Sequence, residues 1–234
     1  MPVIYTPKFQ YQSLEQINSD VGRYYETPCG KVPSVTTILS AVPDDDKTEA
    51  LTKWRNFVGD SEANRILKES GNVGTLVHKH LESYIKGEER PRGNNIIRKQ
   101  SEKLSQVIIE RGLSHVSEVW ATEVPLYYPG LYAGTTDCVG VYKNKPAIID
   151  FKNSRKLKTN EQVKDYHCQL AAYALAHNYI YGTDIETVVI MMVCRGDPNI
   201  SDFGKYQEWV IEGADYENAT RMWAKKLEQY YNQI

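Results

Sequence analysis

Apolar residues follow a helical period in the first half of the chain and a strand period after Gly112. In the first half, apolar positions recur every three to four residues, which is typical of amphipathic helices. This pattern predicts four helices, over residues 46–59, 61–71, 71–87 and 94–111. Residues 1–45 show only short strand-like pieces and a Ser/Thr-rich apolar run between Pro33 and Pro43.

The second half is rich in Val, Ile, Thr and Tyr, which favour extended backbone. Strands are predicted over residues 117–128, 131–142, 146–152, 187–195 and 206–211. Helical periodicity returns over 160–181 and again from Asp215. The sequence YKNKP, which begins at Tyr142, separates two of the strands and predicts a hairpin turn.

This order of elements predicts an α/β fold with a mixed central sheet flanked by helices. No internal repeat, low-complexity segment or linker interrupts the 234 residues, so we expect a single domain over 1–234. Within it, the expected parts are a mainly helical N-terminal region over 1–116, a sheet-containing core over 117–212 and a C-terminal helix over 213–234.

Composition and charge are those of an ordinary globular protein, with 41% hydrophobic residues, 25% charged residues and a formal net charge of −2. Two local basic runs, over 86–103 and 152–164, are of a kind that usually forms solvated surfaces, and only their position on either side of a carboxylate cluster gives weak support for a polyanionic substrate. The chain lacks an apolar run of membrane-spanning length, a secretory leader and a transit-peptide pattern. Its four cysteines form no CxxC pair. We therefore expect a cytoplasmic location, in the host cytoplasm if the source is viral.

The apolar strand Ala147-Ile148-Ile149 runs directly into Asp150, and Lys152 follows two residues later. Side chains two apart on a strand share a face, so Asp150 and Lys152 project together while Phe151 points to the opposite layer. Asp137, on the preceding strand of the hairpin, can lie near Asp150. Two neighbouring carboxylates repel unless a positive charge lies between them, and a divalent cation is the natural candidate. A lone D-x-K occurs by chance, but D-x12-D-x-K across a hairpin favours a functional site.

Two further motifs strengthen this interpretation. In GNVGTLVHKHLESY, His78 follows two glycines, Gly71 and Gly74, that would permit a close backbone approach, and an imidazole is a suitable metal ligand. His80 falls on the apolar stripe and is interpreted as a structural histidine. In DYHCQLAAYALAH, Gln169 and Tyr173 are four residues apart and share one helical face.

The ordered set G-x-x-x-H-x-x-L-E, D-x12-D-x-K and Q-x-x-x-Y resembles the RecB-type branch of the PD-(D/E)XK nuclease superfamily. The sequence PSVTT, which begins at Pro33, and the helix that contains Lys53 and Trp54 further resemble the mitochondrial genome maintenance exonucleases and their phage-encoded relatives. The resemblance covers roughly residues 30 to 175. It implies a PD-(D/E)XK nuclease core.

The resemblance also implies a role for each matching residue. It implies that Lys152 is the catalytic lysine and that Mg²⁺ or Mn²⁺ is bound by His78, Asp137, Asp150 and the carbonyl of Phe151. Glu123 fits an acidic catalytic position, although an ordinary solvent-facing Glu on a strand is as good a reading. Glu82 either braces His78 or has no role in the site. DNA contacts are implied for Gln169 and Tyr173, and for an arch over residues 33–60 that contains Ser34, Thr36, Thr37, Lys53 and Trp54.

The function expected from these features is a metal-dependent exonuclease that acts on single-stranded DNA in DNA processing, repair, recombination or degradation. An endonuclease of the same fold and a catalytically idle module that binds single-stranded nucleic acid are the alternatives. One branch of the superfamily carries an iron–sulfur cluster, but the cysteines here are not clustered, so no cluster is expected. Replication or recombination proteins are candidate partners, and we expect a monomer that does not associate with membranes.

Overall fold

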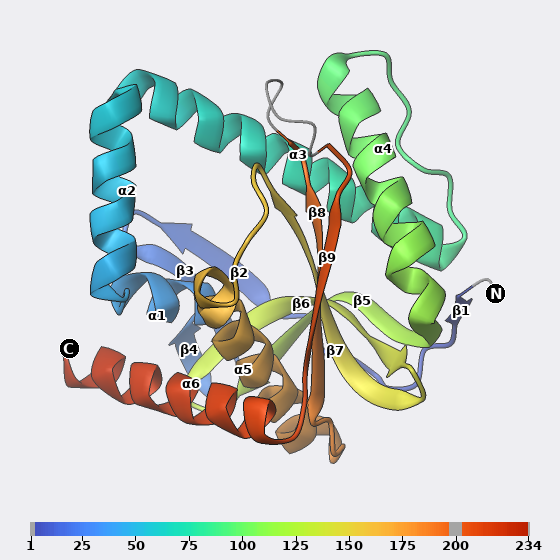
Figure 1. The fold of residues 1–234 in the computed structure, drawn as a ribbon. Coiled ribbons are helices and arrows are strands. Elements are labelled where there is room, and N and C mark those ends of the chain that lie inside the picture. The colour runs from blue at the N-terminus through green and yellow to red at the C-terminus, as the bar shows by residue number, and fades with distance from the viewer. Residues whose placement is uncertain (1–2, 197–202, 234) are drawn as a thin grey trace.

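The structure is a computed structural model that describes residues 3–196 and 203–233. Its centre is a six-stranded sheet in the order β1-β5-β6-β7-β8-β9 (Figure 1). The bounds are β1 Ile4–Tyr5, β5 Val116–Tyr128, β6 Tyr132–Tyr142, β7 Lys145–Ser154, β8 Thr187–Cys194 and β9 Tyr206–Ile211. Strands β5, β6 and β7 form an antiparallel meander, β8 is parallel to β7, and β9 is antiparallel to β8. The predicted mixed sheet is therefore confirmed.

The turn between β6 and β7 has the chemistry of a tight hairpin. Lys143 and Asn144 both adopt positive φ, at 44° and 65°, which matches a two-residue turn of type I′. This turn fixes the register in which Cys138 lies opposite Ile149. Asp137 and Asp150, the two carboxylates that the sequence pattern places together, are the next residues along the two strands beyond this pair.

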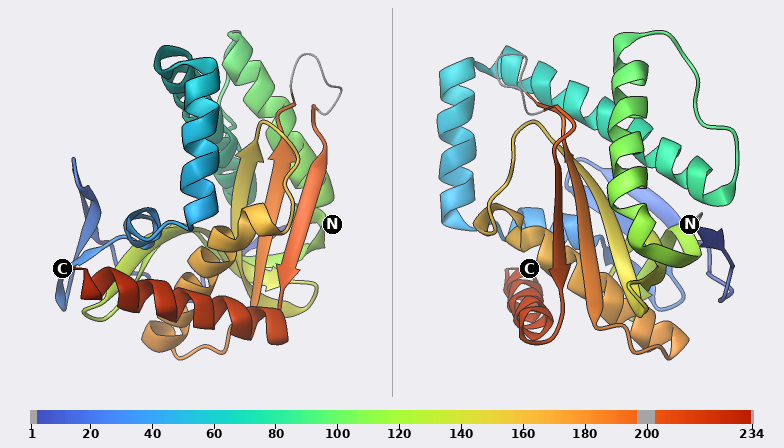
Figure 2. Two further views of the ribbon diagram at one scale, coloured as in Figure 1. Left: turned by 60° about the vertical axis from the view of Figure 1, so that its left-hand side comes forward. Right: turned by 45° about the vertical axis from the view of Figure 1, so that its right-hand side comes forward.

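Helices cover both faces of the sheet, as Figures 1 and 2 show. One face packs against α1 Val35–Ala41, α5 Lys164–Tyr181 and α6 Ala214–Asn232. The other face packs against α3 Asp60–Lys86 and α4 Ile96–Arg111. Every residue of β8 is buried, as expected for a strand covered on both faces next to a parallel partner. The helix α5 is the crossover that connects β7 to β8, and a short 3-10 turn, η2 Glu161–Val163, precedes it.

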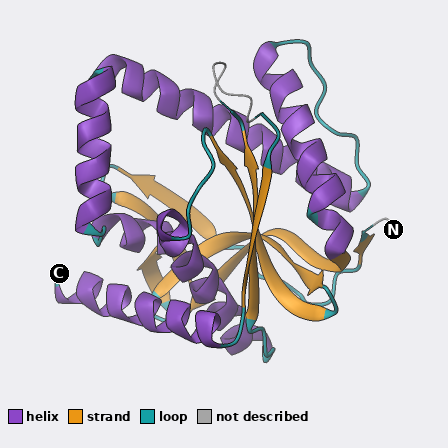
Figure 3. Cartoon of the chain, viewed as in Figure 1, coloured by secondary structure: helices purple, strands orange, loops and turns teal. Residues whose placement is uncertain are grey.

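Helix α3 corrects the prediction of two separate helices over 61–71 and 71–87. It runs without interruption from Asp60 to Lys86, through Gly71 and Gly74 (Figure 3). A glycine inside a helix costs about 1 kcal/mol relative to alanine, and the burial of Val73, Val77 and Leu81 against α4 and the sheet offsets that cost. The helix ends at Gly87, which adopts the left-handed conformation.

The first 45 residues contain more regular structure than their sequence indicates. Strands β2 Glu15–Ser19, β3 Gly22–Thr27 and β4 Gly30–Pro33 form a separate antiparallel sheet. Tyr25 and Val32 form the core of this small sheet together with Tyr127 and Ala133 of the central sheet.

A 3-10 turn, η1 Leu113–His115, leads from α4 into β5. In the part of the chain described, no helix is both long and apolar enough to cross a membrane.

Helix α2 Asp45–Val58 rises from the end of α1 to the start of α3 at one edge of the molecule (Figure 1). No residue of α2 whose burial is described is buried, and α3 is its main packing partner among the helices and strands. Its lower end is anchored where Lys226 of α6 donates hydrogen bonds to Val42 O and Asp44 Oδ1, both at 2.9 Å. Helices α1 and α2 thus occupy the predicted arch region, 33–60, and the function of that region stays a prediction.

Candidate functional site

A cavity of about 780 Å³ lies between α3, α5 and the central sheet. Its walls come from β5, β6 and β7, from helices α3 and α5, and from the small sheet with the start of α1. Most of the predicted site residues line it, namely His78, Glu123, Asp137, Asp150, Lys152, Gln169, Tyr173, Ser34 and Thr36. The cavity is therefore the place where the separate sequence motifs meet.

Strand β7 presents Asp150 and Lys152 to the cavity on one face, as their spacing predicts. Asp150 is 1% exposed, and the Lys152 ammonium lies 2.5 Å from Asp150 Oδ2 in an ion pair. Burial raises the pKa of Asp150 to about 6, even though Lys152 opposes the shift. Burial alone would lower the pKa of Lys152, but Asp150 and Asp137 raise it, so the lysine is a cation at neutral pH. Phe151 points away into the opposite core.

Strand β6 holds Asp137 beside β7 through the backbone. Asp137 Oδ2 accepts a hydrogen bond from the N–H of Phe151 at 2.7 Å. The carbonyl of the same Phe151 faces α3, where it accepts a hydrogen bond of 2.9 Å from His78 Nε2. A carbonyl can only accept, so Nε2 carries the hydrogen. The backbone N–H and carbonyl of Phe151 therefore connect Asp137 and His78 to one residue of β7.

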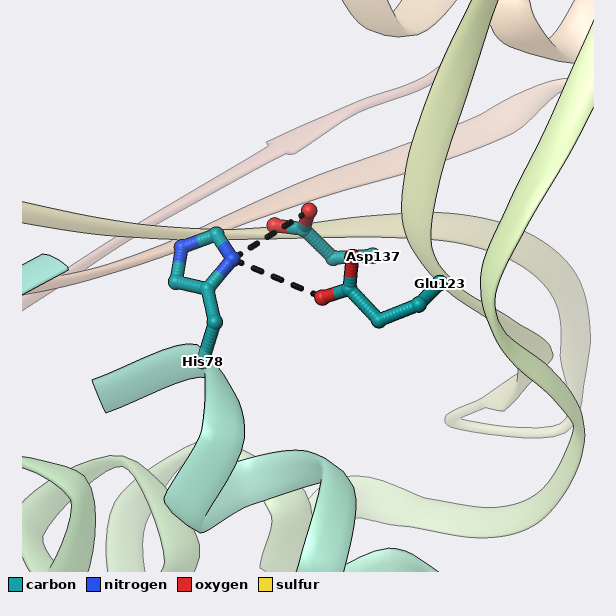
Figure 4. A group of neighbouring side chains, drawn as sticks. All are labelled: His78, Glu123 and Asp137. Atoms are coloured by element: carbon teal, nitrogen blue, oxygen red, sulfur yellow. Dashed lines mark ion pairs between the residues drawn. The ribbon is translucent and has the colours of Figure 1, made fainter. Parts of the chain in front are cut away.

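His78 turns its other ring nitrogen towards two carboxylates (Figure 4). His78 Nδ1 lies 3.5 Å from Asp137 Oδ1 and 3.6 Å from Glu123 Oε1. Burial lowers the pKa of the imidazole, but these carboxylates outweigh burial and raise that pKa to about 9. The same negative surroundings that favour an imidazolium would favour a cation bound at this point.

Glu123 reaches the site through an unusual backbone conformation. It lies on β5 between residues paired with Cys138 and Thr136 of β6, and its φ is +53°. A non-glycine residue rarely adopts such an angle, and the cost is of order 1–3 kcal/mol. Despite this cost, the conformation brings the Glu123 carboxylate to His78 rather than leaving it as a plain outward-facing strand residue.

His78, Glu123 and Asp137 form a ligand set that suits a divalent metal ion. Each offers a ligand atom, and these atoms lie within 4.8 Å of one another. Carboxylate oxygens with one imidazole nitrogen are appropriate ligands for Mg²⁺ or Mn²⁺. Of the four ligands that the resemblance implies, the structure brings His78 and Asp137 into this set. Asp150 is paired with Lys152, and the Phe151 carbonyl is hydrogen-bonded to His78.

Helix α5 contributes Gln169 and Tyr173 to the cavity wall, as their shared helical face predicts. The Gln169 amide donates a hydrogen bond of 3.2 Å to the Tyr173 hydroxyl. Both side chains are buried, at 8% and 3% exposure. Glu82 also lines the cavity, but it pairs with Lys79 at 2.9 Å and Lys86 at 2.6 Å, and no hydrogen bond or ion pair between Glu82 and His78 is found among the described residues. His80 is buried in the core, in agreement with its structural interpretation.

The five residues of the predicted arch differ in their surroundings. Ser34 caps α1, where its hydroxyl accepts the N–H of Thr37 at 2.9 Å, and it also contacts the Thr36 hydroxyl. The Thr37 hydroxyl is occupied by the backbone of Arg23. Lys53 is 73% exposed and pairs with Glu49 on α2. Trp54 is half-buried, and neither it nor Lys53 lines the cavity.

Several cavity residues were not found by sequence reasoning. They are Arg23, Tyr25, Thr75, Leu76, Lys79, Gly134 and Thr135. Arg23 and Tyr25 are two residues apart on β3, so they share one face, but the weak apolar pattern of residues 1–45 did not indicate that strand.

The four cysteines are free, with Cys29 exposed and the others buried. The expectation of no iron–sulfur cluster stays a prediction.

The comparison with known proteins agrees with the resemblance seen in the motifs. No protein-family model matches the chain. The chain is similar to mitochondrial genome maintenance exonuclease 1 of Mus musculus, with 28% identity over 218 residues, covering 85% of this chain and 59% of the mouse protein. The Homo sapiens protein of that name is 27% identical over 213 residues, covering 85% of this chain and 58% of its own. The chain thus spans less than two thirds of the length of these relatives.

Two solved structures are similar to the chain at low identity and low TM-score. A candidate exonuclease from Eubacterium rectale gives a TM-score of 0.45 with 11% identity, covering 70% of this chain and 68% of that one. A phage-related exonuclease from Haemophilus somnus gives a TM-score of 0.37 with 16% identity, covering 68% and 80%. At such scores the two structures carry no weight for function. The resemblance to the mitochondrial genome maintenance exonucleases therefore stands on the sequence.

Proposed function

We propose that the chain is a metal-dependent nuclease that hydrolyses phosphodiester bonds of single-stranded DNA from an end. One observation carries this proposal: His78, Glu123, Asp137, Asp150 and Lys152, from four different elements, converge on a single cavity. Phosphodiester hydrolysis requires an activated water and neutralisation of charge on the phosphate. A set of carboxylates with one histidine and one half-buried lysine is the combination of side chains that supports both.

Each residue has a definite part in this proposal. His78, Glu123 and Asp137 would hold Mg²⁺ or Mn²⁺, with Asp150 as a further ligand. The bound cation would supply Lewis-acid stabilisation of the phosphate and lower the pKa of a water. Lys152, held by Asp150 at 2.5 Å, places its positive charge at the reacting phosphate. Gln169 and Tyr173 form the wall against which the substrate strand lies.

The choice of single-stranded DNA and of attack from an end is supported by two features. The relatives are named exonucleases, although the chain covers only 59% and 58% of their lengths. Helices α1 and α2 make up most of residues 33–60 at the edge of the molecule (Figure 2), where an arch would admit a strand end and exclude a duplex. The relatives are also named for mitochondria, so an organelle competes with the cytoplasm as the location of this chain.

Digestion of DNA with defined ends tests the proposal. The purified chain is incubated with linear oligonucleotides labelled at either end and with a closed single-stranded circle, in Mg²⁺, Mn²⁺ or EDTA. Metal-dependent shortening of the linear strands with resistance of the circle is expected. Asp137→Asn, Asp150→Asn and Lys152→Ala should abolish hydrolysis while circular dichroism and the melting temperature show a folded chain.

The other outcomes identify the alternative functions. Cleavage of the closed circle would assign an endonuclease. Binding of single-stranded DNA without hydrolysis in either metal would assign a binding module and reject the nuclease. Near-normal turnover by Asp150→Asn would reject this cavity as the active site even if the chain degrades DNA.

A further inference from the structure

Arg23 on β3 extends into the same cavity as the candidate catalytic residues, although it lies 55 or more residues from them in the sequence. It shares the cavity-facing side of β3 with Tyr25, whose hydroxyl contacts Thr135 of β6 at 3.1 Å. This contact fixes the small sheet against the central one. Arg23 therefore has a defined position relative to the carboxylates on β6 and β7.

Three contacts with α1 hold the backbone of Arg23. The Arg23 N–H donates to the Thr37 hydroxyl at 2.9 Å, and that hydroxyl donates to the Arg23 carbonyl at 3.0 Å. The same carbonyl accepts the N–H of Ser34 at 2.8 Å. Gly22 makes this approach possible, because a Cβ there would lie 2.6 Å from Thr37 Cγ2. These three hydrogen bonds fix the backbone from which the Arg23 side chain enters the cavity.

Arg23 differs from the other cationic side chains around the cavity in lacking a carboxylate partner among the described residues. Lys152 is paired with Asp150 and Lys79 with Glu82. Arg23 forms no ion pair within the described ranges 3–196 and 203–233, and its Nε donates to the neutral Asn18 across the hairpin at 3.3 Å. No hydrogen bond from the other two guanidinium nitrogens is found in the same ranges. Those nitrogens are free to bind an anion in the cavity.

We propose that Arg23 binds a backbone phosphate of the substrate strand next to the phosphate that is cleaved, and so sets the position of the strand in the cavity. This inference rests on the proposed function. A guanidinium is planar and donates two parallel hydrogen bonds to phosphate oxygens, so it fixes direction as well as distance. Arg23 touches the substrate but not the reacting atoms, and it is therefore a binding and specificity residue.

Binding measurements with three variants test this role. Arg23→Ala should weaken the affinity for a single-stranded oligonucleotide roughly tenfold or more, since hydrogen bonds between charged groups are among the strong ones. The slope of log K against log salt should become shallower by about 0.7, the value for one phosphate contact on a single strand. Arg23→Lys should recover part of the affinity. Arg92→Ala, which removes an exposed arginine paired with Glu89 outside the cavity, is the control for net charge.

The position of the phosphate is found by neutralising phosphates one at a time. In oligonucleotides that carry a single uncharged methylphosphonate, wild type should lose affinity at one linkage beside the cleaved bond, and Arg23→Ala should be insensitive at that linkage alone. Thr37→Val, which removes both hydroxyl contacts to the Arg23 backbone, should give the same pattern with a smaller loss of affinity.

The outcomes separate this inference from the proposed function. If Arg23→Ala binds like wild type with an unchanged salt slope, the inference is wrong, whether or not wild type cleaves DNA. If wild type never cleaves DNA but the Arg23 effects on binding appear, the nuclease assignment fails and the phosphate contact stands. If every methylphosphonate linkage weakens wild type and Arg23→Ala equally, Arg23 contributes only diffuse charge and the proposal is overturned.

Discussion

Gly134 on β6 lies against the ring of Tyr173 on α5, so closely that a Cβ at position 134 would be 2.6 Å from Tyr173 Cε1 and 2.9 Å from its hydroxyl oxygen. Real side chains do not approach to these distances, so the residue at 134 must be glycine if the tyrosine is to keep its place. That place is the cavity wall, where the Tyr173 hydroxyl meets Gln169.

The first prediction is that Gly134→Ala displaces Tyr173 and lowers both stability and function. Overpacking in a filled site costs about 1–3 kcal/mol, so the free energy of unfolding in urea should fall by that amount. Affinity for single-stranded DNA should fall as much as in Tyr173→Ala. In Tyr173→Phe, which keeps the ring, it should fall less. Wild-type stability and affinity in Gly134→Ala would show that the ring has room to move.

Much of the fold could be predicted because its elements depend on local patterns. The strand predicted over 131–142 is found over Tyr132–Tyr142, and the one over 206–211 is found with those bounds. Both are rich in aromatic and β-branched residues and lie between turn signals. The small sheet of β2, β3 and β4 could not be predicted, since most of its side chains are exposed and its core depends on Tyr127 and Ala133 from another sheet.

The candidate site divides in the same way. Asp137, Asp150 and Lys152 were predicted from spacing, because a hairpin register and the alternation of a strand are local properties. The geometry of Glu123 could not be predicted, since its φ of +53° depends on packing at the site. Arg23 belongs to no sequence motif. Its position depends on its own hydrogen bond to Thr37 and on the contact between Tyr25, on the same strand, and Thr135. Only the tertiary structure brings these residues together.

The second prediction compares the two glycines inside α3. A Cβ on Gly71 would meet nothing within 4 Å, whereas one on Gly74 would lie 2.8 Å from Asn153 Nδ2. Gly71→Ala should therefore raise the free energy of unfolding by about 0.5–1 kcal/mol, the gain for alanine over glycine in a helix. Gly74→Ala should lose this gain to the clash. Chemical denaturation measures both, and equal effects would contradict the close approach of Asn153.

The third prediction concerns the pH dependence of stability at His177. This histidine is fully buried, with Nδ1 2.7 Å from the Thr183 hydroxyl and Nε2 3.0 Å from the Tyr11 hydroxyl. Burial lowers its pKa from 6.5 to about 4. As the pH falls below 6.5, His177 takes up a proton in the unfolded chain but stays neutral in the folded chain until about pH 4. The free energy of unfolding therefore falls between about pH 6.5 and 4.

His177→Gln removes this contribution and isolates it from the other titrating groups. Between pH 7 and pH 5, the free energy of unfolding of wild type should fall by about 2 kcal/mol more than that of the variant. Urea denaturation at the two pH values measures the difference. Parallel losses in wild type and variant would mean that His177 takes up its proton in the folded state at an ordinary pH.

The last prediction concerns Trp54 on helix α2. Among the α2 residues whose burial is described, it is the only aromatic side chain that is half-buried. Phe57, on the same helix, is 86% exposed. If α2 forms the predicted arch, Trp54→Ala should weaken binding of single-stranded DNA by on the order of 1–3 kcal/mol, the value for one stacked base. Lys53→Ala should lower the salt slope by about 0.7 if its ammonium leaves Glu49 for a phosphate. Phe57→Ala controls for the loss of an aromatic ring from α2. A melting temperature that falls in Trp54→Ala while the affinity stays unchanged would assign the indole to packing against α3, and α2 would then have no part in holding the strand.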